Sequence, residues 1–330
     1  MRKVKLVQVG LGTWGTNWAT EILPTVETVE LVAYVDIAAT ARERVKAALG
    51  LPDAKLFASL REALAAVECD AVLVTLLTAF HVVACQEALE AGKHVIVEKP
   101  FTPTLAEAAA LVALAEARGR LLMVSQNYRF YPATIAAADL VADGALGRVQ
   151  SVAVDFRRDA GVEGHNYKTI PEPLLADMAI HHFDLLRFVL ADEIETIACR
   201  SWNPVGSPFT HPCAATFWAR SRQGTIVSYR GSLLSRGPQT AWGGEWTMEM
   251  EGAAAFWTSR GSAGVRLAAD RLAVRHAGEE TVARELVPIR HYDRAGTTAA
   301  FASACLSGTI PTRCSGGAVN GRSDAMCEAA

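Results

Sequence analysis

Residues 4–15 read Val-Lys-Leu-Val-Gln-Val-Gly-Leu-Gly-Thr-Trp-Gly, and this stretch decides the fold. Residues 4–9 are mostly Val and Leu, which is typical of a strand buried in a parallel sheet. Glycines follow at positions 10, 12 and 15, and a helical pattern begins among them. A strand, a glycine turn and a helix in this order open a βαβ unit.

The same pattern continues to about residue 125. Short β-branched runs alternate with helical stretches rich in Ala, Leu and Glu. This alternation indicates an α/β domain over residues 1–125, built on a doubly wound parallel sheet. We predict strands at 4–9, 30–36, 54–57, 70–75, 94–98 and 121–125, and helices near 14–23, 39–49, 59–66, 80–91 and 105–119.

Residues 126–330 have a different pattern, which predicts a second, α+β domain with an open and mostly antiparallel sheet. Helices are expected from Pro132, over about 173–190 and over 316–330. Strands are expected at 152–156, 195–202, 213–220, 224–234, 245–251, 254–259, 264–268, 271–276 and 280–287.

The composition narrows the possible partners and the compartment. The 330 residues carry a formal net charge of -3, so we expect neither nucleic acid nor an anionic membrane as a partner. No apolar run approaches the roughly 20 residues of a membrane helix. The seven cysteines show no Cys-x-x-Cys spacing, which favours reduced thiols in the cytoplasm over disulfides or a zinc site.

Five of the seven tryptophans fall in the second half of the chain, several of them on predicted strands. We expect a sheet that is apolar on both faces and therefore needs two covers. Helices of the same chain would cover one face and a second subunit the other, which predicts a homodimer or homotetramer built on that sheet.

The glycine spacing predicts a dinucleotide site. Gly10 permits the tight turn, Gly12 lets the backbone approach a pyrophosphate, and Gly15 lets helix and strand pack closely, with Thr13 and Trp14 between the last two. Asp36 ends the second strand and is placed to accept hydrogen bonds from a ribose. No arginine stands among residues 37–39, so NAD is favoured over NADP.

Two further motifs carry chemistry. Glu98-Lys99-Pro100 follows the buried run 94–97, which places an ammonium in the crevice at the carboxyl end of a parallel strand. Asp177 and His181 are one helical turn apart, where an imidazole can exchange a proton with a substrate hydroxyl near neutral pH. His182 is rotated away and is expected to pack elsewhere. No further ligand cluster supports a metal at this histidine pair.

These motifs, together with Asn127-Tyr128-Arg129-Phe130, resemble the glucose-fructose oxidoreductase/inositol dehydrogenase/MocA family over nearly the whole chain. The resemblance implies a Rossmann domain followed by an α/β domain with an open antiparallel sheet. It also implies NAD(P)-dependent oxidation or reduction of a sugar, cyclitol or related small polyhydroxylated molecule.

The resemblance assigns roles to residues. Lys99 would hydrogen-bond the reacting oxygen, His181 would be the general acid and base, and Asp177 would bind substrate or orient that histidine. Asn127 and Tyr128 would face the substrate. The expected cofactor contacts are Gly10, Gly12, Thr13, Trp14, Gly15, Asp36, Ile37, Leu76, Leu77, His81, Glu98 and Lys99.

The polar loop 159–169, with the strand end before it, is a candidate for reading substrate hydroxyls, and a solvated loop is the alternative. Arg158, His165 and Tyr167 are the residues expected to bind there. Two other functions stay open. One is a glycosidase that uses NAD for transient oxidation and elimination, and the other is a non-catalytic ligand sensor or co-repressor of the same fold.

Overall fold

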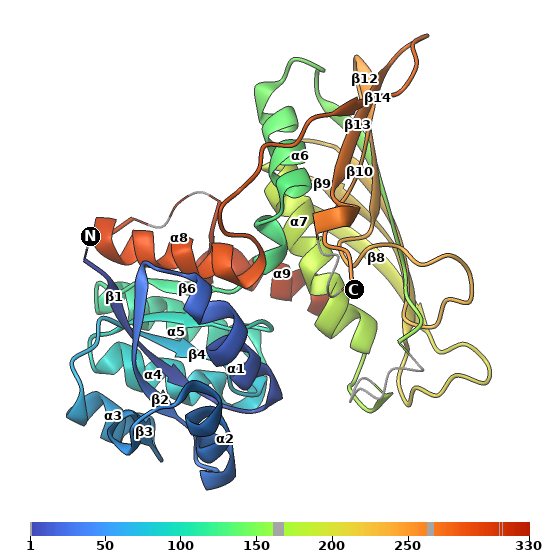
Figure 1. Cartoon of the computed structure of the whole chain (residues 1–330). Helices are drawn as coiled ribbons and strands as arrows, with labels where there is room; N and C mark the ends of the chain where they lie inside the picture. Colours follow the sequence, from blue (N-terminus) through green and yellow to red (C-terminus); the bar gives the residue numbers. More distant parts are fainter. Residues whose placement is uncertain (1, 161–167, 263–266, 310, 312) are drawn as a thin grey trace. The chain divides into compact units, whose positions relative to one another are not determined.

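The computed structural model describes residues 2–160, 168–262, 267–309, 311 and 313–330, and within them the chain forms two units (Figure 1). The first unit comprises Met1–Asn127 and His291–Arg322, and the second comprises Tyr128–Arg290 and Ser323–Ala330. The predicted boundary between the two domains is at residue 125, and all residues beyond it are predicted to belong to the second. The segment His291–Arg322 instead packs with the first unit.

A seven-stranded sheet forms the centre of the first unit, in the order β15-β6-β5-β4-β1-β2-β3. The described pairs are parallel except the edge pair of β15 with β6, which confirms the predicted doubly wound sheet. The order reverses between β1 and β4, which is where such sheets bind ligands. The strands are β1 (Val4–Val9), β2 (Val29–Val35), β3 (Leu56–Phe57), β4 (Ala71–Val74), β5 (His94–Val97), β6 (Leu122–Val124) and β15 (Ser315–Gly316).

Helices pack on both faces of this sheet. One face forms a core with α3, α4 and α5, and α8 contacts β1 and β5. The α-helices of the unit are α1 (Thr13–Asn17), α2 (Ala39–Leu49), α3 (Leu60–Ala66), α4 (His81–Glu90), α5 (Leu105–Ala117) and α8 (Asp293–Ser307). A π-helix, η1 (Trp18–Ile22), extends α1, and short 3₁₀ turns are η2 (Leu23–Thr25), η3 (Asp53–Lys55) and η4 (Thr78–Phe80). A further 3₁₀ turn, η5 (Asn127–Arg129), begins in the first unit and ends in the second.

The second unit contains an eight-stranded sheet in the order β14-β13-β12-β11-β7-β10-β9-β8. Among its described pairs, β7 with β10 is parallel and the others are antiparallel, as predicted. The strands are β7 (Val149–Arg157), β8 (Ile194–Trp202), β9 (Ala214–Ser221), β10 (Ile226–Ser232), β11 (Glu245–Met250), β12 (Ala253–Thr258), β13 (Arg271–His276) and β14 (Val282–Arg284).

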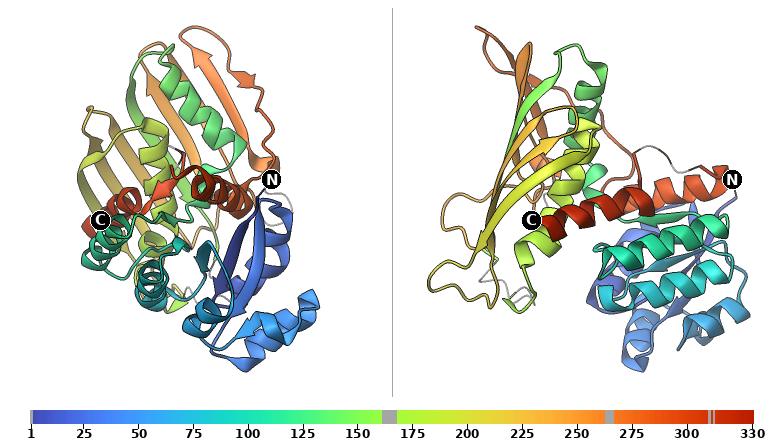
Figure 2. Two further views of the ribbon diagram at one scale, coloured as in Figure 1. Left: turned by 90° about the vertical axis from the view of Figure 1, so that its left-hand side faces the viewer. Right: turned by 180° about the vertical axis from the view of Figure 1, so that it is seen from behind.

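Helices of the second unit cover one face of its sheet (Figures 1 and 2). They are α6 (Pro132–Asp143), the π-helix η7 (Pro173–Ala179) and α7 (Ile180–Leu190), while α9 (Gly317–Ala329) begins in the first unit and ends in the second. The strand predicted at 264–268 falls largely outside the described residues. Its last two residues, 267 and 268, are described and belong to the short 3₁₀ turn η8 (Leu267–Ala269), so the prediction of a strand is wrong there.

The prediction of a sheet that is apolar on both faces is wrong. Residues alternate along β9 and β10, so that Phe217 and Tyr229 are buried while Thr216, Ser228 and Arg230 point to the other, exposed face. The tryptophans divide in the same way. Trp246 and Trp257 stack on each other in the core, whereas Trp202 and Trp218 are exposed.

In the described part of the chain, no helix has both the length and the apolar character needed to cross a membrane.

A buried ion pair joins η5 to α7 inside the second unit. The Arg129 guanidinium donates two hydrogen bonds to the Asp184 carboxylate, both at 2.6 Å, and the two side chains are 4% and 1% exposed. Ser323 also donates to Asp184, at 3.5 Å. Because both charges are withdrawn from water, each depends on the other for compensation.

Replacing Asp184 with Asn should lower the free energy of unfolding by about 3–5 kcal/mol, because the Arg129 charge would stay buried without its counter-ion. Glu195→Gln is the matched control. It removes the charge from an ion pair with Arg220 whose side chains are about half exposed, so it should cost no more than about 1 kcal/mol. Urea unfolding followed by circular dichroism measures both. Equal losses in the two variants would contradict the assignment.

Candidate active site

The glycines at positions 10, 12 and 15 have different surroundings. Gly10 adopts φ +97°, and a Cβ on Gly15 would lie 1.9 Å from the Gly10 carbonyl oxygen. Neither position therefore accepts a side chain without a shift of backbone. Gly12 is different, because nothing lies within 4 Å of the place that a Cβ would take there. We call Gly10–Gly15 the glycine loop, and the open space at Gly12 is where a pyrophosphate requires it.

Two buried polar side chains support the glycine loop, and neither was predicted from the sequence. Gln8 donates from Nε2 to the Gly15 carbonyl at 2.7 Å, and Thr75 donates from Oγ1 to the Gly10 carbonyl at 2.7 Å. The signal available in the sequence was a polar residue within or directly after an apolar strand. Together they satisfy carbonyl groups that the tight turn leaves outside the sheet.

Asp36 faces the glycine loop from the end of β2. Its Oδ2 accepts from the Leu11 amide at 2.7 Å, and its Oδ1 accepts from the Ala38 amide at 2.8 Å. Each carboxylate oxygen can accept a second hydrogen bond, which leaves capacity for ribose hydroxyls. Arg42, from α2, donates to the carbonyl oxygens of Asp36 and Ile37 at 2.6 and 3.1 Å. Arg42 lies beyond residues 37–39, and its place beside Asp36 was not predicted.

Large apolar side chains are exposed after three neighbouring strands, β2, β1 and β4. They are Ile37 (90% exposed), Trp14 (45%), Leu77 (76%) and Phe80 (57%). Phe80 was not predicted. Exposed apolar groups beside an open glycine position and an acceptor carboxylate fit an adenine dinucleotide, which presents flat rings, ribose hydroxyls and a pyrophosphate.

Lys99 follows β5 in the same unit, and the Lys99–Pro100 peptide bond is cis. His81 lies beside this turn with its Nδ1 3.0 Å from the Pro100 carbonyl oxygen and its Nε2 3.0 Å from that of Leu76. The His81 side chain is 1% exposed. Its imidazole therefore braces the turn after Lys99 in this structure and does not present a nitrogen outward.

The second unit contains the predicted acid–base pair. Asp177 lies in the π-helix η7 and His181 in the first turn of α7, so the pair spans the junction between the two helix types. The His181 ring stacks on Tyr128 with centroids 3.9 Å apart and planes 4° from parallel. The Arg260 guanidinium carbon lies 4.4 Å from the Tyr128 centroid, so the ring that holds His181 itself contacts a cation.

His182 is part of the core, as predicted. Its Nδ1 lies 3.1 Å from the Tyr229 hydroxyl and its Nε2 3.1 Å from the Trp242 carbonyl oxygen. Since the carbonyl only accepts, Nε2 carries the proton and Tyr229 donates to Nδ1. Burial lowers the pKa of His182 to about 4, which keeps it neutral near pH 7. The described residues contain no group of three or more His, Cys, Asp or Glu arranged to hold a metal.

The remaining predicted substrate residues have different surroundings. Asn127 donates from its amide to the Asp293 carboxylate within the first unit. In the second unit, Arg158 is 9% exposed and its guanidinium carbon lies 4.3 Å from the Trp242 ring centroid. His165 and Tyr167 lie outside the described residues.

Asp270 was not among the predicted residues. It accepts a hydrogen bond from the Arg260 amide, and burial raises its pKa to about 6.

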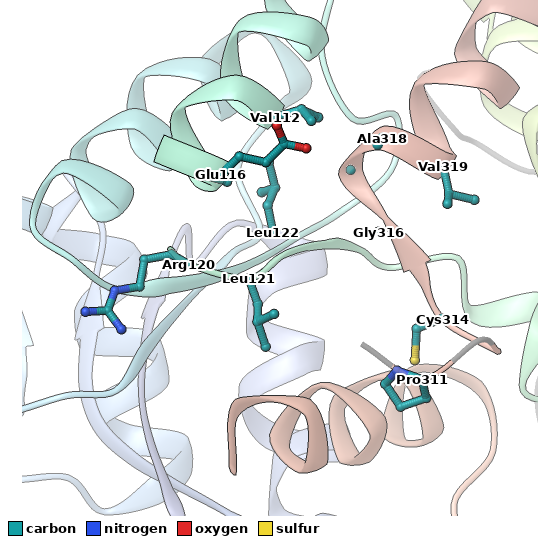
Figure 3. Close-up of a pocket in the computed structure, with 12 residues that line it drawn as sticks. Val112, Glu116, Arg120, Leu121, Leu122, Pro311, Cys314, Gly316, Ala318 and Val319 are labelled. Atoms are coloured by element: carbon teal, nitrogen blue, oxygen red, sulfur yellow. The ribbon is translucent and has the colours of Figure 1, made fainter. Parts of the chain in front are cut away.

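A cavity of about 370 Å³ lies elsewhere in the first unit, between α5, β6 and residues 314–319 (Figure 3). Glu116, Arg120 and Cys314 line it together with small and aliphatic residues. Neither the glycine loop nor Lys99 is among its described lining residues, so it is distinct from the predicted cofactor crevice.

The two glycine positions predict separable effects. Gly12→Ala should leave the unfolding free energy within about 1 kcal/mol of the wild type, because the position has ordinary φ and open space. It should still weaken NADH binding about tenfold or more, because the methyl group would stand where the pyrophosphate approaches. Gly15→Ala should destabilise the fold by about 1–3 kcal/mol through overpacking. Urea unfolding and NADH titration measure the two effects, and normal NADH affinity in Gly12→Ala would contradict the assignment.

Comparison with known proteins assigns both halves of the chain. Residues 4–126 match the oxidoreductase family with an NAD-binding Rossmann fold, and residues 134–258 match the GFO/IDH/MocA C-terminal domain. The chain is 31% identical over 195 residues to inositol 2-dehydrogenase of Agrobacterium fabrum, covering 58% of this chain and 55% of that protein. It is 32% identical over 174 residues to D-apiose dehydrogenase of Paraburkholderia graminis, covering 52% and 46%.

The chain thus spans about half the length of these curated relatives. Among solved structures, an oxidoreductase from Agrobacterium radiobacter in complex with NAD+, L-tartaric acid and magnesium shares the fold. The TM-score is 0.86 at 19% identity, and the alignment covers 99% of this chain and 95% of that one. The two family matches show that this chain belongs to the glucose-fructose oxidoreductase/inositol dehydrogenase/MocA family, with an NAD-binding Rossmann domain over residues 4–126.

Proposed function

We propose that the protein is an NAD(P)-dependent dehydrogenase or reductase acting on a CH–OH group of a sugar, cyclitol or related polyhydroxylated compound. The observation that carries the proposal is Lys99 at the carboxyl end of β5, in the unit that also holds the open glycine loop and Asp36. Two relatives are named for inositol and D-apiose, which are polyhydroxylated, and this supports the substrate class.

The bound NAD would supply the hydride acceptor, held by the glycine loop, Asp36 and the exposed apolar side chains after β1, β2 and β4. The protein's own groups would handle the oxygen and its proton. Lys99 would donate a hydrogen bond to the reacting oxygen and stabilise the negative charge that develops there. His181 would take the hydroxyl proton during oxidation and return it during reduction.

The surroundings of His181 suit this role. Stacking on Tyr128 fixes the plane of the imidazole. The His181 side chain is 3% exposed, so a substrate hydroxyl would have to reach a ring nitrogen in a site withdrawn from bulk water. Asp177, one turn earlier, would orient the imidazole or bind a neighbouring substrate hydroxyl. We include Asn127, Tyr128 and Arg158 in the substrate site, and we propose NAD as the preferred cofactor because the Asp36 carboxylate would repel a 2′-phosphate.

The test begins with a panel of cyclitols, aldoses, sugar acids and anhydrosugars, scanned with NAD and NADP for the absorbance of reduced nicotinamide. On the substrate found, Lys99→Ala and His181→Ala should each lower kcat by about a hundredfold to ten-thousandfold, with NADH affinity nearly unchanged. Lys46→Ala and His276→Ala are controls on a surface helix and an edge region of the sheet, and both should keep wild-type turnover. Wild-type turnover in either active-site variant would refute the role of that residue.

Cofactor preference gives a second prediction. Asp36→Asn should weaken NADH binding and lower the ratio of NADH affinity to NADPH affinity by about tenfold or more. The charge that repels the 2′-phosphate is lost, while a hydrogen-bond acceptor remains. Adding Arg42→Ala should remove part of any gain in NADPH affinity, since Arg42 contacts the Asp36 and Ile37 carbonyls. Fluorescence titration with each reduced cofactor measures the ratio, with the exposed Asp53→Asn as control. An unchanged ratio in Asp36→Asn would contradict the NAD assignment.

A further inference from the structure

The Glu98 carboxylate is buried at the end of β5 and accepts three hydrogen bonds. Its Oε1 accepts from the indole Nε1 of Trp14 at 3.0 Å and from that of Trp18 at 2.8 Å. Its Oε2 accepts from the backbone amide of Lys99 at 3.0 Å. Glu98 is 5% exposed, so its charge depends on these donors and on the charges around them.

The donors come from two separate parts of the first unit. Trp14 belongs to the glycine loop and to the first turn of α1, and Trp18 begins η1, which continues that helix. Lys99 follows β5, and β4 lies between β5 and β1 in the sheet. One carboxylate therefore connects the helix that follows β1 with the turn that follows β5.

Arg294 of α8 completes this cluster. Its guanidinium carbon lies 4.0 Å from the Trp14 ring centroid and 5.3 Å from that of Trp18, and it donates to Asn17 Oδ1 at 2.5 Å. Arg294 is 1% exposed. A buried cation against the two indole rings polarises them, which makes their N–H groups better donors to the Glu98 carboxylate. We call Trp14, Trp18, Glu98 and Arg294 the indole clamp.

We propose that Glu98 is a positioning residue for Lys99. When a pyrophosphate binds the glycine loop, the indole clamp changes the position of Lys99. Trp14 is part of the loop that receives the pyrophosphate, so any adjustment of the loop on binding acts on the hydrogen bond at Oε1. The carboxylate is one rigid planar group, so a displacement at Oε1 changes the position of Oε2 and the amide it holds. The catalytic side of this inference rests on the proposed function, because only there does Lys99 contact substrate.

Two substitutions interrupt the clamp at different points. Glu98→Gln keeps an oxygen for the two indole donors but replaces the acceptor at the Lys99 amide with an NH₂ group, which cannot accept. Trp14→Phe keeps a ring over Arg294 but removes one indole donor. Trp14 is 45% exposed, so this variant is expected to fold even if Glu98→Gln does not. Trp218→Phe, at a tryptophan that is 47% exposed on β9 of the second unit, is the matched control.

The first readout needs no activity. Lysine amines are labelled by reductive methylation with ¹³C-formaldehyde, and the Lys99 resonance is assigned by its loss in Lys99→Arg. The probe is ADP, which carries a pyrophosphate for the glycine loop but no nicotinamide to touch Lys99. ADP should shift the Lys99 resonance in the wild type and in Trp218→Phe. It should shift it at most weakly in Trp14→Phe and Glu98→Gln at saturating ADP.

The second readout is kinetic. Both clamp variants should lower kcat about tenfold to a hundredfold with little change in the KM of the polyol, since misplacement of a catalytic group acts on the chemical step. Their effects should not add in the double variant, because both cut the same connection. An ADP shift that is absent from the wild type, or that persists unchanged in both variants, would overturn the inference. If the shift behaves as expected but no polyol is turned over, the clamp stands and the proposed function fails.

Discussion

The close approach of α1 to the Gly10 carbonyl is the constraint on which the rest of the first unit depends. Gly15 has no side chain, so the helix can begin directly above the end of β1. Thr75 at the end of β4 and Gln8 within β1 then satisfy the carbonyls of the turn. This start position brings Trp14 and Trp18 to Glu98 and leaves Gly12 facing open space. Phosphate recognition and the surroundings of Lys99 thus have one steric origin.

The parts of the molecule that were predictable from sequence are those with local or periodic signals. The strand and helix order of residues 1–125, the helix from Pro132 and the long helical stretch 173–190 follow from hydrophobic period and turn residues. The glycine loop and the place of Asp36 follow from spacing, because backbone geometry demands it. The inward position of His182 followed from its rotation relative to His181.

Contacts between distant segments carried no such signal. Arg294 donates a hydrogen bond to Asn17, which is 277 positions away in the sequence, and no local pattern around either residue predicts this contact. The return of His291–Arg322 to the first unit is of the same kind, because an amphipathic helix pattern does not say which sheet it will cover. The number of tryptophans in the second half does not reveal the outer face of the second sheet, because strand register decides which side chains point inward. Trp246 and Trp257 are buried, whereas Trp202 and Trp218 are exposed.

The adjacent histidines His181 and His182 in α7 have different neighbours. Burial and two hydrogen bonds hold His182 in one neutral tautomer, with its pKa at about 4. His181, the neighbouring residue, is also buried, at 3% exposed, and its ring stacks on that of Tyr128. The second unit also places two of its arginines against aromatic rings, Arg158 on Trp242 and Arg260 on both Tyr128 and Trp242.

The segment His291–Arg322 has a consequence for how the gene can be divided. A fragment that stops at Asn127 would encode every parallel strand of the first sheet, but it would lack α8, which packs against β1 and β5, and with it the guanidinium above the two indoles. The nucleotide-binding unit is therefore not one continuous segment of the chain. Recombination that exchanged residues 128–290 as a cassette would preserve it, whereas exchange at a single crossover point would not.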